Sequence, residues 1–167
     1  FKYLPDANFK CGKKKYKYLR KSNGDYKIIR ITLAYGNNKS SHKCFAVQMI
    51  KNFLEFKPVK LFTDQYRSPT YFNDIAIFSH LIGTKGRENI YHFSGKRHLT
   101  RYEFGRIMCN IGGFDESLIV PVQSTDIKDN VLRPRNLQMN TDRFFKEFSV
   151  EPTPLETAIK KTIESVR

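Results

Sequence analysis

The feature that most constrains the fold is a short apolar run that leads through a polar loop into a helical pattern. The run at 59–62 is strand-like, a polar loop follows at 63–70, and apolar residues then recur with helical spacing over about 71–82. Pro69 restricts its own φ and favours an extended Ser68, so the loop is stiff just before the helix begins. This order predicts an α/β fold with a ligand-binding loop.

The polar loop gathers several kinds of side chain that suit contact with a ligand. Its carboxylate, amide, guanidinium and hydroxyl groups belong to Asp64, Gln65, Arg67, Ser68 and Thr70. Such groups can bind a polar ligand, but Asp64 and Thr70, with Asn73, can equally cap and close a turn. From these residues alone both interpretations stay open.

Strand-like and helix-like segments alternate along the rest of the chain. Strands are predicted at 26–33, 59–62 and 89–94, with short extended pieces at 120–122 and 137–139 in an otherwise irregular stretch. Helices are predicted at 10–21, around 46–54, at 71–82 before the glycines at 83 and 86, from Thr100 to Gly112, and from Pro154 onward. Thr100 and Glu103 form a capping-box pattern. We expect parallel strands in one sheet, joined by helices that pack on it.

Composition limits the class of protein and its compartment. With 167 residues, 40% of them hydrophobic, the chain can form one domain with a core. No apolar run approaches the roughly 20 residues that span a bilayer. Three cysteines without C-x-x-C spacing and four histidines without ligand spacing predict neither a disulfide framework nor a metal site. The cytoplasm, or an organellar matrix, is the expected location.

The net charge of +14 lies in one part of the chain. Residues 1–60 have 15 Lys and Arg against three acidic residues, while the remainder has 15 against 13. A local basic excess can bind nucleic acid, an acidic protein or an anionic ligand, or it can reflect lysine-rich composition alone. In the helix predicted at 10–21, Lys15 points toward the protein, where a lysine needs a partner or a function.

Four blocks of residues, in register, carry a resemblance. They are Asp64-Gln65-x-Arg67-Ser68-Pro69-Thr70-x-x-x-Asp74-Ile75-Ala76, Ile90-Tyr91-His92-Phe93-Ser94-Gly95, Tyr102-Glu103-Phe104 and Arg133-Pro134-Arg135-Asn136-x-x-Met139-Asn140-Thr141. The series resembles the C-terminal half of dTDP-4-dehydrorhamnose reductase-like proteins in the extended short-chain dehydrogenase/reductase superfamily. The methionine adenosyltransferase regulatory β subunits are similar. Asn140 stands where the family usually has Asp.

The resemblance implies the C-terminal portion of a Rossmann-type fold with a small lobe on the substrate side. It implies one partial domain over 1–167, in which 1–36 is the remnant of the Rossmann core and 37–167 is the substrate-binding side. The cofactor implied is NAD(P). The family's glycine-rich turn, which binds the pyrophosphate, has no counterpart in this sequence. We therefore do not expect this chain alone to bind the cofactor, and we expect an apolar strand edge to be open or covered by another chain.

The resemblance also assigns catalytic and cofactor-binding positions. Cys11-Gly12-Lys13-Lys14-Lys15 matches the family's Tyr-Gly-x-Ser-Lys, so Lys15 falls on the catalytic lysine and Cys11 on the tyrosine that transfers the proton. A thiol is shorter than a phenol, so the usual proton transfer is not expected. Leu33 stands where rhamnose-forming reductases tend to have a Trp that packs on the sugar. Leu33 and Tyr35, with Lys15, are the implied cofactor contacts.

The implied substrate contacts are Gln65, Arg67, Ser68, Thr70, Arg133 and Arg135. Arg67, with Arg133 or Arg135, matches phosphate oxygens, although a salt bridge that closes the lobe is an equal alternative. Three functions stay open. The chain is the substrate-binding part of a nucleotide-sugar reductase-like protein with impaired catalysis and a missing N-terminal half, or a non-catalytic regulatory or structural subunit that binds another protein, or, least favoured, a nucleic-acid-associated accessory protein.

Overall fold

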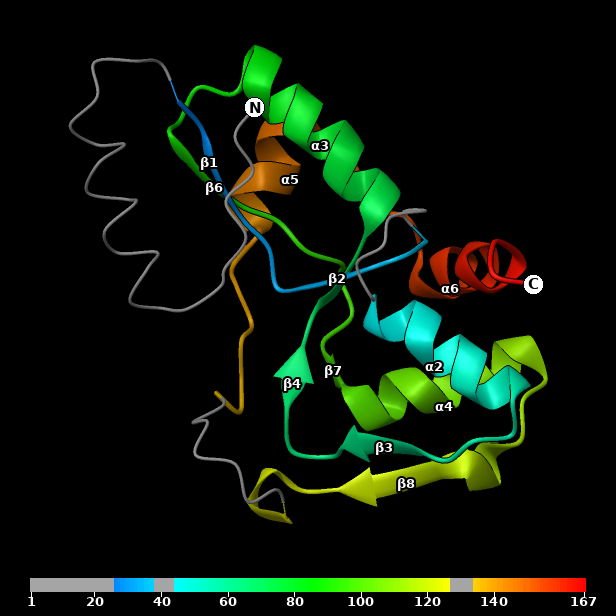
Figure 1. The fold of residues 1–167 in the computed structure, drawn as a ribbon. Helices are drawn as coiled ribbons and strands as arrows, with labels where there is room; N and C mark the ends of the chain where they lie inside the picture. Colours follow the sequence, from blue (N-terminus) through cyan, green and yellow to red (C-terminus); the bar gives the residue numbers. More distant parts are fainter. Residues whose placement is uncertain (1–25, 38–43, 127–133) are drawn as a thin grey trace.

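A computed structural model describes residues 26–37, 44–126 and 134–167, in which strands and helices alternate (Figure 1). The strands are β1 (Ile28–Arg30), β2 (Leu33–Tyr35), β3 (Val59–Phe62), β4 (Tyr66–Arg67), β5 (Pro69–Tyr71), β6 (Ile90–His92), β7 (Leu99–Thr100) and β8 (Ile119–Val122). The helices are α2 (Phe45–Leu54), α3 (Phe72–Lys85), α4 (Arg101–Gly112), α5 (Asp142–Phe148) and α6 (Leu155–Glu164), with 3-10 turns η1 (Glu116–Leu118) and η2 (Ser124–Asp126). The predicted α/β class is confirmed. None of the described helices is both long and apolar enough to cross a membrane.

The described strands pair two by two, which differs from the single sheet that we predicted. β1 runs parallel to β6 as expected, but β2 pairs with β5 and β3 pairs with β8, both parallel, while β4 and β7 are antiparallel. The strand predicted at 26–33 is divided at Thr32, whose hydroxyl donates to the carbonyl of Ser68. The apolar pattern does not show this division, because strand partners are chosen by contacts that are distant in sequence.

The segment predicted as a polar loop at 63–70 is mostly extended. Tyr66–Arg67 forms β4 beside β7, and Pro69–Tyr71 forms β5 beside β2. Pro69 is the first residue of β5, a position at which a missing N–H is tolerated. These strands are too short for an alternating pattern to reveal them.

The helix predicted at 10–21 lies outside the described residues, and most of the other predicted helices begin and end where the sequence predicts. The capping box of α4 is present: Thr100 Oγ1 accepts from the Glu103 N–H at 3.1 Å, and the Glu103 carboxylate accepts from the Thr100 N–H at 2.6 Å. α6 begins after Pro154, as predicted. In α2 the inward residues are buried except Leu54, which is 42% exposed at the end of the helix.

Two helices differ from the prediction. α3 continues through Gly83 to Lys85 and ends before Gly86. Gly83 is exposed, and a helical glycine costs about 1 kcal/mol relative to Ala, which is too little to end a helix that packs on a core. α5 was not predicted, because its seven residues carry too few apolar repeats to show a period.

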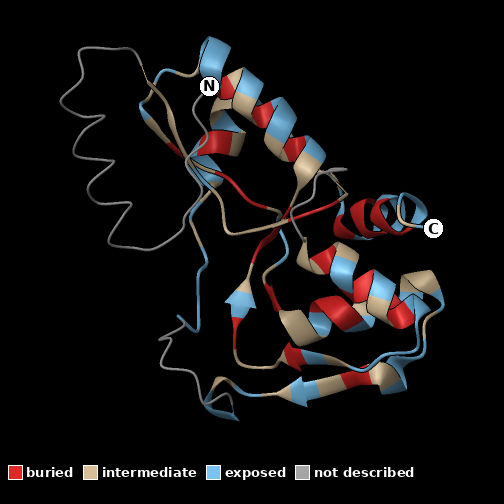
Figure 2. Ribbon diagram, in the orientation of Figure 1, coloured by how far each residue is buried: buried red, intermediate tan, exposed pale blue. Residues whose placement is uncertain are grey.

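Buried side chains form two clusters, visible as the red faces of the helices in Figure 2. The larger cluster joins α2, α4 and α6 with β3 and β8. It consists of Tyr35, Ala46, Met49, Ile50, Phe53, Leu61, Leu99, Phe104, Met108, Cys109, Ile119, Leu155, Ala158, Ile159 and Ile163. The smaller cluster joins α3, α5 and β6 and consists of Phe78, Ile82, Tyr91, Phe93 and Phe144. Each fully buried large side chain contributes roughly 1.5–3 kcal/mol.

One edge of the two-stranded sheet formed by β1 and β6 lies beside the smaller cluster. In the part of the chain that the structure describes, β1 pairs with β6 alone, so its other edge has no strand partner there. Ile28 and Ile29 are half-buried on this strand. An apolar strand with an unpaired edge is a template for a further strand.

Candidate functional site

The Gln65–Thr70 segment, which includes β4 and the start of β5, has its polar side chains turned into the protein. Gln65, Ser68 and Thr70 are 3%, 4% and 1% exposed. Gln65 Nε2 donates to Ser124 Oγ at 3.1 Å, and Thr70 Oγ1 donates to the Ser68 carbonyl at 3.2 Å. These three residues therefore make the segment rigid.

Asp64 anchors the start of this segment to η2. Its carboxylate accepts from the Ser124 N–H at 3.1 Å and from Ser124 Oγ at 2.9 Å. Burial alone would raise the pKa of Asp64, but these hydrogen bonds and the nearby Arg135 charge outweigh it, so the pKa lies below its ordinary value. For Asp64 the geometry matches the turn-closing interpretation.

Arg67 joins two of the blocks that carry the resemblance. Its Nη1 donates to the carbonyls of Tyr66 at 2.6 Å and Arg135 at 3.3 Å, and its Nη2 donates to the carbonyl of Pro134 at 2.9 Å. The Tyr66 N–H also donates to the Arg135 carbonyl at 2.7 Å, and the Leu137 N–H donates to the Tyr66 carbonyl at 3.2 Å. Within the described residues, Arg67 thus closes the lobe through main-chain carbonyls.

A second arginine, which the sequence analysis missed, lies near Arg67. Burial and, after it, the charge of Arg101 lower the pKa of Arg67 below its ordinary value. Arg101 is the first residue of α4, and its guanidinium lies over the ring of Phe45 at 5.2 Å. A cation at the first position of a helix is disfavoured by the helix dipole, which is the signal that could have identified it. With Arg135, whose charge acts on Asp64, positive charge gathers beside the segment.

His98 contacts the same segment from the loop before β7. Its ring stacks on Tyr66 with centroids 5.6 Å apart, and its Nδ1 lies 3.4 Å from Ser68 Oγ. The Nε2 atom is buried and has no hydrogen-bond partner among the described residues. A buried polar atom without a partner costs free energy, so Nε2 suits a hydrogen bond with a bound ligand. No spacing in the sequence distinguishes His98 from an ordinary histidine.

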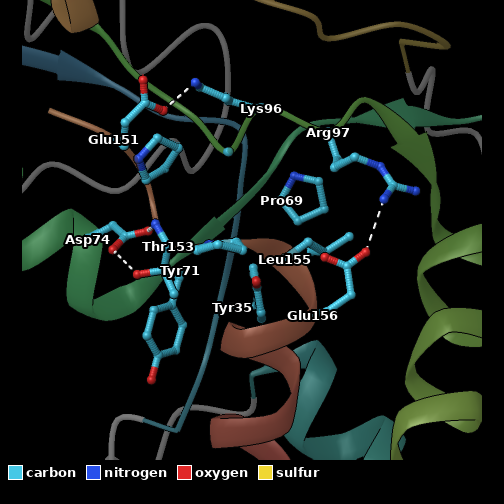
Figure 3. Close-up of a pocket in the computed structure, with 13 residues that line it drawn as sticks. Tyr35, Pro69, Tyr71, Asp74, Lys96, Arg97, Glu151, Thr153, Leu155 and Glu156 are labelled. Carbon is cyan, nitrogen blue, oxygen red and sulfur yellow. Dashed lines mark hydrogen bonds and ion pairs between the residues drawn. The ribbon is translucent and has the colours of Figure 1, made fainter.

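A cavity of about 360 Å³, which we call the Tyr35 cavity, lies where α3, α6 and the loop after β6 meet (Figure 3). Lys96 pairs with Glu151, and Arg97 pairs with Glu156 at 3.0 Å. Asp74 accepts from the N–H of Thr153 at 3.0 Å and from its Oγ1 at 2.7 Å. Three carboxylates therefore outnumber two cations on the wall, so this cavity does not select an anion.

The predicted cofactor and catalytic residues are placed only in part. Cys11 and Lys15 lie outside the described residues, as does Arg133, which was predicted as a substrate contact. Tyr35 is 1% exposed, and its ring contacts those of Tyr71 and Phe104 at 5.8 and 5.1 Å.

Burial, followed by the charge of Asp74, raises the pKa of Tyr35 well above its usual value. Leu33 is half-buried beside Pro69 and has no polar side-chain atom. These two residues offer a dinucleotide no exposed polar side-chain group. Their role in cofactor binding stays a prediction.

The fold is that of the Rossmann-type extended short-chain dehydrogenases/reductases. The dTDP-4-dehydrorhamnose reductase of Clostridium acetobutylicum matches with a TM-score of 0.78 and 18% identity, over 94% of this chain and 54% of that chain. The dTDP-4-dehydrorhamnose reductase of Bacillus anthracis in complex with NADP matches with a TM-score of 0.76 and 19% identity, over 92% of this chain and 54% of that chain. The UDP-glucose 4-epimerase of Thermotoga maritima with UDP-glucose matches with a TM-score of 0.72 and 18% identity, over 93% of this chain and 50% of that chain.

Sequence comparison identifies the family within this class. The RmlD substrate binding domain family matches residues 13–167, and the chain belongs to it. Methionine adenosyltransferase 2 subunit beta of Danio rerio is 28% identical over 105 residues, which are 59% of this chain and 32% of that protein. The spore coat polysaccharide biosynthesis protein SpsK of Bacillus subtilis is 26% identical over 151 residues, which are 87% of this chain and 50% of that protein. The resemblance inferred from the sequence is confirmed, and the chain spans about a third to a half of the length of these relatives.

Proposed function

We propose that this chain is the substrate-side part of an NAD(P)-dependent nucleotide-sugar reductase-like protein whose catalysis is impaired. The observation that supports this proposal is the positive charge at the Gln65–Thr70 segment: Arg67 lies within it, the charge of Arg101 acts on Arg67, and the charge of Arg135 acts on the adjacent Asp64. These residues come from three separate parts of the chain. Guanidinium groups match phosphate oxygens, and a nucleotide sugar carries two phosphates. The predicted division at residue 36 and the cytoplasmic or organellar location belong to this proposal.

The described residues would act on the substrate by position and charge. Arg67 is held by carbonyls, so it contributes positive charge and fixes the segment, while Arg101 and Arg135 supply further cationic contacts to the phosphates. Tyr66, which is 42% exposed, and His98 Nε2 would contact the sugar. NAD(P) supplies the hydride when it is bound, but the residues that would hold it are not among those described here.

Substrate binding is tested by calorimetric titration of the full chain with dTDP-glucose. We expect Arg135→Gln to weaken binding by about tenfold, the lower part of the range for one hydrogen bond to a charged group. Arg106→Gln is the matched control, because Arg106 is also an exposed arginine but pairs with Glu116 far from the segment. If the unaltered chain does not bind dTDP-glucose, or if Arg135→Gln binds as well as the control, the proposed substrate site is wrong.

Impaired catalysis is tested separately, with the dinucleotide-binding half supplied. Cys11 falls on the tyrosine position of the family, and general acid–base catalysis contributes about 10²–10⁴-fold. We expect Cys11→Tyr to increase the rate of NAD(P)H-dependent reduction of a dTDP-linked keto sugar by a factor of that order. Equal rates would mean that another residue transfers the proton.

A non-catalytic regulatory subunit is the second candidate function. Two observations favour it: the likeness to methionine adenosyltransferase 2 subunit beta, and the use of Arg67 to hold the protein's own carbonyls. We expect such a subunit to co-elute with a methionine adenosyltransferase catalytic subunit in size-exclusion chromatography. Co-elution that persists in Arg135→Gln supports this function, and separate elution argues against it.

A further inference from the structure

A second cavity, of about 260 Å³, lies between the two-stranded sheet of β1 and β6 and the start of α5. We call it the Arg30 cavity. The described residues that line it are Arg30, Ile90, Tyr91, His92, Asn140, Arg143 and Phe144. This lining includes two guanidinium groups, an amide and an imidazole; no carboxylate belongs to the described lining, although the Glu88 carboxylate pairs with Arg143. The Tyr35 cavity differs, because three carboxylates lie on its wall.

The strand ends determine the position of the Arg30 cavity. Arg30 and His92 are the last residues of β1 and β6, and they are partners in the parallel register. Ligands of open parallel sheets bind beyond the carboxyl ends of the strands. The opposite wall comes from Asn140 and Arg143, so segments from three parts of the chain enclose this space.

The contact between Arg30 and His92 shows which protonation state the imidazole has. Arg30 Nη1 lies 3.2 Å from His92 Nε2, and because a guanidinium can only donate, Nε2 is the acceptor. Burial and, after it, the charge of Arg30 lower the pKa of His92 below its ordinary value. His92 is therefore neutral near pH 7, and it holds one side of the Arg30 guanidinium.

The other two polar groups of the cavity, on Arg143 and Asn140, can bind a ligand with little loss of folding free energy. Arg143 Nη2 lies 2.5 Å from Glu88 Oε1, but its side chain is 65% exposed, and exposed ion pairs contribute little to stability. Asn140 accepts from the Asp142 N–H at 2.9 Å through Oδ1, so its Nδ2 group is the part that can donate to a ligand.

We propose that the Arg30 cavity binds a phosphate monoester. The phosphate lies between the guanidinium groups of Arg30 and Arg143 and accepts from Asn140, while the organic part lies against Ile90 and Phe144. Two guanidinium forks suit the oxygens of a phosphate, and the two apolar side chains favour a small organic substituent. This site is separate from the Gln65–Thr70 segment and does not depend on the function proposed for it.

The test is a titration of the full chain followed by the ¹³C–¹H resonance of the His92 imidazole. Inorganic phosphate and glucose 1-phosphate each replace chloride at constant ionic strength. We expect a saturable shift with both ligands and tighter binding of glucose 1-phosphate. Equal affinities would limit the site to free phosphate and overturn the monoester assignment. The absence of a saturable shift would overturn the site.

Variants of Asn140 distinguish a phosphate site from a general effect of charge. Asn140→Asp places a carboxylate in the cavity, so we expect at least tenfold weaker binding, and Asn140→Ala, which only removes the donors, should have a smaller effect. Asn110→Asp on the exposed face of α4 adds the same charge elsewhere and should bind like the unaltered chain. Equal binding by Asn140→Asp and Asn110→Asp contradicts the proposal. Arg135→Gln should leave the titration unchanged, which separates this site from the proposed substrate site.

Discussion

The larger and the smaller buried cluster are enclosed in different ways. The larger cluster lies among α2, α4 and α6 and is sealed by the β3–β8 pair, so helices and strands of this chain surround it. The smaller cluster lies between α3 and α5 on β6, next to the strand β1 whose second edge has no strand partner in the described residues. Regions with fewer buried contacts open first. The comparison therefore predicts that the smaller cluster is the less stable part of the chain.

The two clusters also differ in composition. Phe144 is the centre of an aromatic group in the smaller cluster, with ring centroids 5.0 Å from Phe78, 5.1 Å from Phe148 and 5.4 Å from Phe93. The larger cluster is mostly aliphatic, and Phe104 has aromatic neighbours only at its edge by β2 and α2. A core that depends on one ring has few other contacts to compensate when that ring is lost.

The largest effect is expected from removal of the central ring. Phe144→Ala should lower the free energy of unfolding of its region by about 3–5 kcal/mol, through lost burial and a cavity. Hydrogen exchange should become faster in α3, α5 and β6 while α4 and α6 stay protected. Phe104→Ala, an equally buried ring, should instead increase exchange throughout the chain. If both variants give the same exchange pattern, the two clusters form one cooperative unit.

The next effect concerns the connection between the clusters. Asp74, in the first turn of α3, accepts two hydrogen bonds from Thr153 just before α6. Asp74→Ala leaves both donors without an acceptor and should cost about 1–3 kcal/mol in denaturant unfolding. Thr153→Val keeps the N–H donor and should cost less. An equal loss in the two variants would mean that the hydroxyl bond alone connects the clusters.

A smaller effect is expected at the start of α4, within the larger cluster. Thr100→Ala removes the hydroxyl that accepts from the Glu103 N–H, and loss of such a cap costs about 1 kcal/mol. Thermal unfolding followed by circular dichroism measures this loss. Thr84→Ala is the control, because it removes an exposed hydroxyl from α3 that bonds only carbonyls of its own helix. Equal changes in both variants would show that the capping box adds no stability.

The smallest effect depends on pH. Because hydrogen bonds from Ser124 hold the pKa of Asp64 below its ordinary value, the charged carboxylate stabilises the folded chain above the unfolded pKa of about 3.9, and this contribution is lost as the pH falls through the folded pKa. Asp64→Asn should therefore be less stable than the unaltered chain at pH 7, by less than about 1 kcal/mol because the site is partly exposed. The difference should shrink below about pH 4. A constant difference across this range would exclude a charge effect.

Local patterns in the sequence determined α2, α4 and α6, the capping box and the family. Residues three and four positions apart share a helix face whatever the rest of the chain does, so the inward sides of α2, α4 and α6 could be predicted. The Thr100 and Glu103 pair is local for the same reason. The order of the four blocks was sufficient to identify the family, because each block is a continuous run of residues.

Only the tertiary structure decided the strand partners and the use of the polar side chains. β3 pairs with β8, and Arg67 donates to a carbonyl 68 positions away. Neither contact can be predicted from the spacing of apolar residues along a short segment. His98 and Arg101 join the Gln65–Thr70 segment because β4 pairs with β7, the strand that leads into α4. Long-range pairing depends on which apolar faces can be buried together, and that is a property of the whole folded chain.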